Sequence, residues 1–258
     1  MELTTSEIYS WVGSLFWPFV RLSAMFMAAP VWGARTLPVR IRIVLALVIS
    51  FMLYPVLPAA PAVEPFSPAG YLITLQQVLI GVAMGFLLQL VMGAMVIAGQ
   101  NVAMSMGLGF ASAVDPQNGV QVPVMSQYYT VFTTLVFLAL DGHLLLLETL
   151  VQSFRLLPIG SAGFTADFAW QIASWGTYMF AGGVLVALPV MTSMLLVNLS
   201  FGVMTRVAPQ LNIFAVGFPI TLLAGFVLVL FSTSSLLPQI SQLFADALMT
   251  LQEIIRNG

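Results

Sequence analysis

Six apolar segments, separated by short polar or proline-rich connections, make up most of the chain. They cover approximately residues 8–32, 43–57, 71–106, 124–147, 169–199 and 214–237. A transmembrane helix needs roughly twenty predominantly apolar residues, which most of these segments provide. The pattern therefore predicts an all-α membrane protein with about six apolar helical segments.

The third segment is too long for an ordinary span. Its roughly thirty-six residues would form a helix about 54 Å long, whereas the hydrocarbon core of a bilayer is about 30 Å thick. We expect this helix either to break or to extend beyond the bilayer inside a larger assembly. Near the C-terminus, apolar residues at helical spacing predict a short amphipathic helix over about residues 239–258. No internal repeat divides the sequence, so a single membrane domain, residues 1–258, is expected.

A polar, glycine-rich stretch from Gly99 to Pro123 lies between two of the apolar segments. Gly107 permits backbone angles that other residues avoid, and proline disfavours a helical conformation at the residue before it. We therefore predict that one helix ends near Met106 and that the next begins near Pro123. A loop of roughly fifteen residues is longer than most connections, which favours a functional role. At membrane depth such backbone must be buried in protein or face water.

Composition supports the membrane assignment. Hydrophobic residues make up 60% of the chain and charged residues 6%, whereas about a quarter of residues are charged in soluble proteins. The absence of cysteine excludes disulfides and thiol catalysis, and no basic patch indicates nucleic acid. Arg35, Arg40 and Arg42 cluster in one short connection, so the positive-inside rule predicts that this connection is cytoplasmic.

One face of the third segment carries small and amide side chains at helical spacing. Its members are Gly85, Gln89, Gly93, Gln100, Ala103 and Gly107. Glutamines would be unsatisfied in lipid, so this face is expected to meet other helices or water. Plain helix packing and the lining of a conduit both remain open. Gly81 and Gly85 form a small-xxx-small pair that allows another helix to approach closely.

Few charged residues lie within the apolar segments. Arg21 needs a buried partner, for which Asp141 and Glu148 are candidates, or else reaches an interface. Asp141, His143 and Glu148 lie close in sequence, but residues 141 and 143 would point about 200° apart on a helix. Asp141-Gly142 instead indicates a turn or helix end. No catalytic site, cofactor or metal site is predicted.

The central loop and a second polar segment supply the remaining candidates. Asp115 either closes a turn or holds the loop in position. Methionines that fill the core or form a deformable seal flank the loop: Met92, Met95, Met104, Met106 and Met125. Pro209 should end the fifth segment, where Gln210 and Asn212 can satisfy freed backbone groups. Arg206 precedes this corner and either caps carbonyls or pairs with a carboxylate on a neighbouring subunit.

Two stretches together resemble a known family. GQNVAMSMGLGFASAVDP, residues 99–116, is similar to the signature of the FliR family of type III export-gate subunits, which includes injectisome counterparts. NLSFGVMTRVAPQLNIFAVGFP, residues 198–219, resembles the family's other well-marked segment. The apolar segments fit the family's layout, so the resemblance covers essentially the whole chain.

The resemblance implies a non-enzymatic subunit of the flagellar type III export gate. It implies kinked helical hairpins in a helical gate assembly with several copies of FliP and FliQ, contact with FlhB and possibly FlhA, and passage of unfolded flagellar subunits. The implied location is the bacterial inner membrane, in the flagellar basal body, rising toward the periplasm. This would explain the long third segment, and it conflicts with the topology predicted from the arginines.

On this resemblance, about residues 107–122 are a plug-like loop that closes the pore. Its candidate residues are Gly107, Gly109, Phe110, Val114, Asp115, Pro116 and Gly119. Candidates for gate and helix contacts are Gln89, Gly93, Gln100, Met104, Met106, Arg206, Gln210 and Asn212. Two alternatives stay open: a virulence-type secretion homologue, which shares the motifs, and a stand-alone secondary transporter with broken helices.

Overall fold

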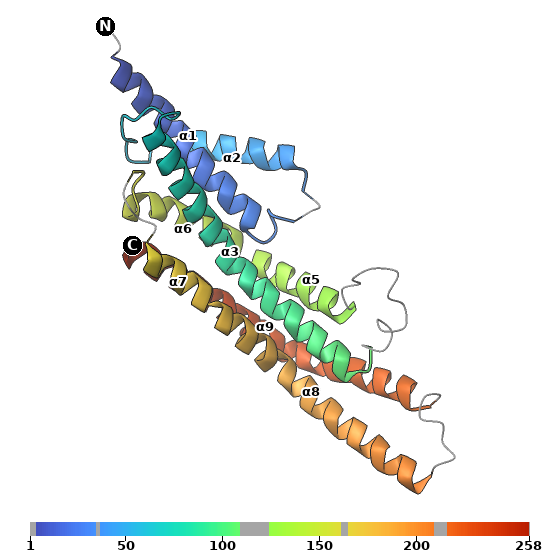
Figure 1. Ribbon diagram of the computed structural model, residues 1–258. Helices are drawn as coiled ribbons and strands as arrows, with labels where there is room; N and C mark the ends of the chain where they lie inside the picture. The colour runs from blue at the N-terminus through green and yellow to red at the C-terminus, as the bar shows by residue number, and fades with distance from the viewer. Residues whose placement is uncertain (1–3, 35–36, 109–123, 161–164, 209–215, 258) are drawn as a thin grey trace. The chain divides into compact units, whose positions relative to one another are not determined.

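All regular secondary structure in the described part of the chain is helical, which confirms the all-α prediction. The structure is a computed structural model that describes residues 4–34, 37–108, 124–160, 165–208 and 216–257. Its helices are α1 (Thr5–Ala28), α2 (Val39–Leu53), α3 (Pro68–Ser105), α5 (Val124–Ala139), α6 (Gly142–Leu156), α7 (Ala166–Ser174), α8 (Gly176–Val207) and α9 (Phe218–Asn257) (Figure 1).

Four helical stretches among the described residues are long and apolar enough to cross a membrane. They are Thr5–Ala28, Pro68–Ser105, Ala166–Val207 and Phe218–Arg256. A fifth span is possible if α5 and α6 count together. The second predicted segment does not reach this length, because α2 has only 15 residues. The chain is an integral membrane protein, with fewer spanning candidates than apolar segments.

The boundaries of several helices follow the sequence, and others depart from it. α3 is unbroken over 38 residues, which corresponds to about 57 Å. The fourth predicted segment is two helices, because Asp141 adopts a left-handed φ of 54° at the turn expected there. The stretch expected as a separate tail helix is the C-terminal part of α9, which continues through Pro238. Within it Leu251 and Ile255 are buried, an amphipathic pattern.

The chain groups into two compact units. Unit 1 contains Met1–Val91, Leu138–Gly176 and Phe244–Gly258, and unit 2 contains Met92–Phe137 and Thr177–Leu243. The helices α3 and α9 contribute residues to both units. The boundary between the two units therefore falls inside continuous helices.

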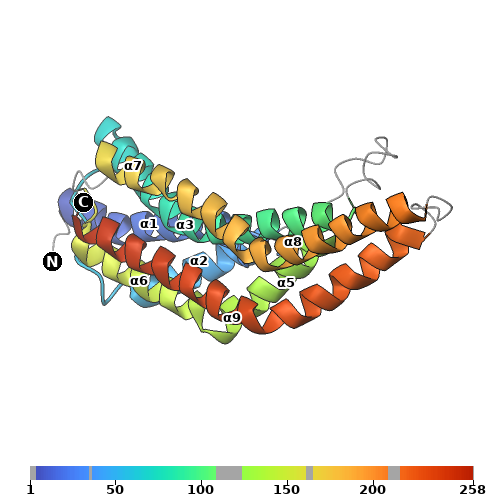
Figure 2. The ribbon, with the colours of Figure 1, turned by 90° about the horizontal axis from the view of Figure 1, so that it is seen from below.

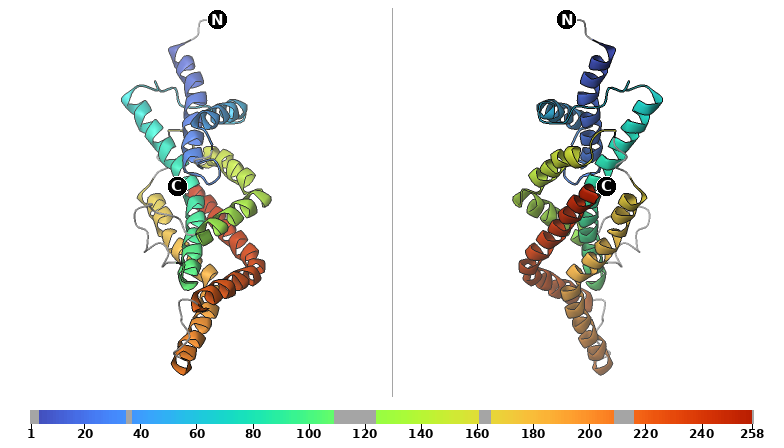
Figure 3. Two further views of the ribbon diagram at one scale, coloured as in Figure 1. Left: turned by 90° about the vertical axis from the view of Figure 1, so that its right-hand side faces the viewer. Right: turned by 90° about the vertical axis from the view of Figure 1, so that its left-hand side faces the viewer.

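Unit 1 is built on a close crossing of α1 and α3 (Figure 3). A methyl group added at Gly81 would lie 2.2 Å from the carbonyl oxygen of Arg21, and one at Gly85 would lie 2.6 Å from the backbone nitrogen of Ala29. Only glycine permits this backbone separation, which confirms the prediction for the small-xxx-small pair. Trp17 is fully buried beside the crossing and donates a hydrogen bond of 3.2 Å from Nε1 to Thr74.

Unit 2 contains the end of α3, most of α5 and α8, and the first part of α9. Figure 2 shows α8 and α9 running side by side, and Gly182 of α8 faces the side chain of Leu243 of α9. Large apolar side chains remain exposed on both helices, for example Leu196 and Leu230. Such surfaces must be covered by lipid or by other apolar protein.

Candidate functional site

In unit 2, α3 ends at a glycine C-cap, as the sequence predicts. Gly107 has a φ of 80°, and its N–H donates to the carbonyl of Met104 at 3.0 Å. The N–H of Leu108 donates to the carbonyl of Ala103, also at 3.0 Å. These two bonds form a Schellman motif, which satisfies carbonyls that have no partner inside the helix. The chain therefore leaves the helix at a defined position at the start of the predicted plug-like loop.

The two signature segments meet at this helix end. The side-chain amide of Asn198, in α8, donates a 3.3 Å hydrogen bond to the carbonyl oxygen of Ser105, the last residue of α3. This carbonyl is one of the four that an α-helix leaves unpaired at its C-terminus. Asn198 is not among the site residues predicted from the sequence. Its signal was present, because Asn198 is the only amide between Met191 and Arg206 in an otherwise apolar stretch.

Helix α9 contacts the same helix end. Met106 is fully buried, and a methyl group at Gly225 would lie 2.5 Å from its Cγ atom. The ring of Phe218 lies 3.7 Å from the position that a Cβ atom would take at Gly107. Met106 therefore packs directly against Gly225 of α9, where its flexible thioether fills an irregular gap.

The other end of the predicted loop begins against α3. A methyl group at Gly99 would lie 2.5 Å from the Cα atom of Ser126, near the start of α5. The Ser126 hydroxyl donates to the carbonyl of Val96 at 3.0 Å. Helices α3 and α5 thus touch backbone to backbone in unit 2, which sets where the chain re-enters a helix after Pro123.

The remaining predicted residues have different environments. Gly109, Phe110, Val114, Asp115, Pro116, Gly119, Gln210 and Asn212 lie outside the described residues. Gln89 and Gln100 are exposed, Gly93 is half-buried beside Met179, and Arg206 is exposed near the end of α8. Met92, Met95 and Met125 are buried like Met106, whereas Met104 is 63% exposed. The role of these residues in a gate stays a prediction.

Arg21 occupies a separate buried site in unit 1. Its side chain is fully buried, which excludes the alternative that it reaches an interface. Its Nε donates to Gln77 at 2.8 Å, and its terminal nitrogens donate to Ser153 Oγ at 2.9 Å and to the carbonyl of Leu157 at 3.0 Å. The guanidinium also lies 4.1 Å from the ring centre of Phe154.

The prediction that Asp141 or Glu148 pairs with Arg21 is therefore wrong. Neutral acceptors hold the guanidinium, and the planar fork of arginine suits several acceptors at once. The bond to Leu157 also caps the C-terminal end of α6 with a cation, which its helix dipole favours. Arg21 thus links α1, α3 and α6 within unit 1.

The three residues at the start of α6 make separate contacts. Asp141 forms the turn before the helix, and His143 lies beside Trp32, with ring centres 6.4 Å apart. A carboxylate oxygen of Glu148 accepts a hydrogen bond from the Gln152 amide at 3.3 Å. Among the described residues, no group of three histidine, cysteine or acidic side chains is placed to hold a metal ion.

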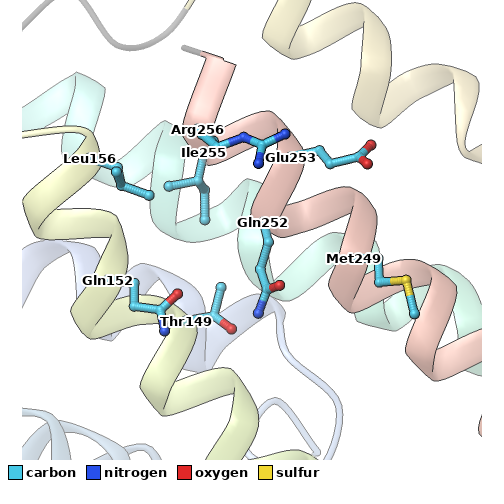
Figure 4. A pocket seen from close by; sticks show the side chains of 8 residues that line it. All are labelled: Thr149, Gln152, Leu156, Met249, Gln252, Glu253, Ile255 and Arg256. Atoms are coloured by element: carbon cyan, nitrogen blue, oxygen red, sulfur yellow. The ribbon is translucent and has the colours of Figure 1, made fainter.

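A small pocket lies in unit 1 between α6 and the last turns of α9 (Figure 4). Its volume is about 370 Å³, and its walls include Thr149 and Gln152 of α6 and Gln252 of α9. Glu253 and Arg256 lie at its outer edge, and both are exposed. The lining combines amides and a hydroxyl with the apolar side chains of Leu156, Met249 and Ile255.

Comparison with known proteins decides the family. The model of "Bacterial export proteins, family 1" matches residues 12–247, which include both signature segments. The chain belongs to this family of export proteins. This confirms the resemblance read from residues 99–116 and 198–219.

Curated relatives in this export family carry the name flagellar biosynthetic protein FliR. The protein of Escherichia coli K12 is 36% identical over 99% of this chain and 97% of its own length. That of Pectobacterium carotovorum is 36% identical over 96% and 95%, and that of Bacillus subtilis 168 is 28% identical over 92% of both chains. The chain is a FliR-type component of the flagellar export apparatus, within the type III export family.

Proposed function

We propose that this chain is a subunit of the flagellar export gate. With FliP and FliQ it forms the inner-membrane channel for unfolded flagellar subunits, and residues 107–122 close the pore. One observation carries the proposal: the two signature segments of the family meet where the predicted loop begins, through Asn198 and Ser105. The end of α3 and the start of α5, on either side of the predicted loop, are tightly packed. The loop is therefore attached at two fixed points.

Exposed polar side chains on apolar helices support an assembly. Gln89 and Gln100 are exposed on α3, and an amide facing lipid would lose its hydrogen bonds. Neighbouring subunits or a water-filled conduit would satisfy them. FliP and FliQ are the proposed neighbours, with FlhB and FlhA as further partners. A helix of about 57 Å exceeds the hydrocarbon core, which supports an assembly rising toward the periplasm within the basal body.

Deletion of several residues between Gly109 and Gly119 tests the pore-closing role. The expected result is normal assembly of the gate but increased permeability of the membrane to ions, measured as conductance in reconstituted bilayers. The matched control replaces the same residues with a glycine–serine segment of equal length in a chain that keeps Gly107 and Val124. Unchanged conductance after the deletion would contradict a plug at this position.

Complementation separates the flagellar role from the virulence-type alternative. We expect the chain to restore swimming in a flagellated strain that lacks its own FliR. It should fail to restore secretion in a strain that lacks the injectisome counterpart. The reverse result would assign the chain to virulence-type secretion and leave the loop proposal intact.

A further inference from the structure

An apolar groove lies between α1 and α2 in unit 1. Its walls are the side chains of α1 between Trp11 and Phe19 and, from α2, Leu47 and Ser50. Its volume is about 430 Å³, within the range of ligand sites of roughly 300–1,000 Å³. Ser50 donates its hydroxyl to the carbonyl of Ala46 at 2.7 Å, so the one polar wall residue is already satisfied. The groove therefore suits hydrocarbon rather than water or a polar chain.

The helix that forms one side of this groove is exposed on almost every face. In α2 only Ala46 and Ser50 are buried, whereas Phe51 and Met52 are each 69% exposed. Its 15 residues correspond to about 22 Å, less than the hydrocarbon thickness of a bilayer. A helix of this length is too short to cross the bilayer, and its exposed apolar side chains must be covered by lipid or by other apolar protein.

Positive charge is concentrated at the start of α2. Between Glu7 and Glu64 the sequence contains four arginines and no acidic residue. Arg21 is used internally, and Arg42 bonds the carbonyls of Ala34 and Leu37 in the preceding turn. Arg40 is exposed and has no hydrogen bond or ion pair within the part of the chain that the structure describes. Its guanidinium is free to bind an anion.

The spacing of charge and groove matches a phospholipid. Leu47 follows Arg40 by seven residues, about 10 Å along α2, and each leaflet contributes about 15 Å of hydrocarbon. A phosphate bound at Arg40 would place its acyl chain at the depth of Leu47. We propose that the groove between α1 and α2 holds an acyl chain of an anionic phospholipid whose phosphate binds Arg40. Anionic lipids attract basic segments that lie close to a membrane surface.

Tryptophan quenching by brominated lipids tests this site. The gate assembly containing the full chain is placed in phosphatidylcholine nanodiscs with a small fraction of brominated phosphatidylglycerol or brominated phosphatidylcholine. The fluorescence of Trp11 is obtained as the difference between the fluorescence of the chain and that of its Trp11→Phe variant. Trp170, 73% exposed on α7, is the matched control, measured in the same way with Trp170→Phe.

We expect brominated phosphatidylglycerol to quench Trp11 at about a fivefold lower mole fraction than brominated phosphatidylcholine. Trp170 should show no preference. Arg40→Gln should abolish the preference at Trp11, whereas Arg155→Gln, at an exposed position of α6, should preserve it. Equal quenching by both lipids, or a preference that survives Arg40→Gln, would overturn the proposal. Absence of quenching at Trp11 by either lipid would also overturn it and would indicate that a partner subunit covers the groove.

Discussion

Replacing Gly99 by alanine should separate α3 from α5. The new Cβ atom would lie 2.5 Å from the Cα atom and 2.6 Å from the nitrogen of Ser126. Both are backbone atoms, so no side-chain rotation can relieve the overlap. Because carbon atoms pack at about 3.5–4.0 Å, the two helices would have to move apart by about 1 Å. This movement would also weaken the hydrogen bond from Ser126 to Val96.

The magnitude follows from these contacts. Overpacking costs about 1–3 kcal/mol, and the hydrogen bond contributes about 0.5–1.5 kcal/mol. The helical preference of alanine over glycine offsets up to about 1 kcal/mol of this loss. Gly202→Ala is the matched control, because nothing lies within 4 Å of a methyl group there. Both variants gain this helical preference, so it cancels between them. We therefore expect the two variants to differ in free energy of unfolding by about 1.5–4.5 kcal/mol, with Gly99→Ala the less stable.

The assay is reversible unfolding of the purified chain in mixed micelles with increasing SDS, followed by helical circular dichroism. Gly225→Ala should be intermediate, because its methyl group meets the flexible side chain of Met106 rather than backbone. Equal stability of Gly99→Ala and Gly202→Ala would refute the backbone contact between α3 and α5. It would also remove the argument that the second end of the predicted loop is tightly held.

Three further variants test other contacts by the same unfolding measurement. Arg21→Lys should lose roughly 3 kcal/mol, because one ammonium cannot reach all the acceptors of the guanidinium fork, while exposed Arg155→Lys should change little. Asn198→Leu should lose roughly 1 kcal/mol by removing the donor to the last carbonyl of α3, whereas Ser200→Ala should be neutral. Gly107→Ala should cost about 1–2 kcal/mol at a left-handed φ, and faster hydrogen exchange at the end of α3 would locate the effect. If Arg21→Lys, Asn198→Leu or Gly107→Ala unfolds with the stability of the unchanged chain, the contact that this variant removes is contradicted.

Local signals in the sequence predicted the limits of the helices well. Gly107 marked the end of α3, Val124 follows the predicted start at Pro123, and α8 ends two residues before Pro209. These features act within one turn of the helix, through left-handed glycine and the missing N–H of proline. Composition likewise predicted a membrane protein, and the two motifs predicted the export family.

The differences between the structure and the predictions from sequence also have physical causes. Hydropathy predicted one apolar segment over residues 124–147, because it does not register a change of helix direction, and only the local Asp141-Gly142 signal indicated the turn. The tail after Gln239 continues α9, because a proline such as Pro238 can lie inside a long helix whose neighbours hold it. Charge alone suggested carboxylate partners for Arg21, but an amide, a hydroxyl and a carbonyl can satisfy a buried guanidinium.

The sequence by itself determined several helix limits, that the helices lie in a membrane, and which export family they belong to. Only the tertiary structure decided which groups meet. The bond from Arg21 to Ser153 spans 132 positions, and that from Asn198 to Ser105 spans 93. Contacts over such separations depend on how whole helices pack, which one-dimensional periodicity does not encode.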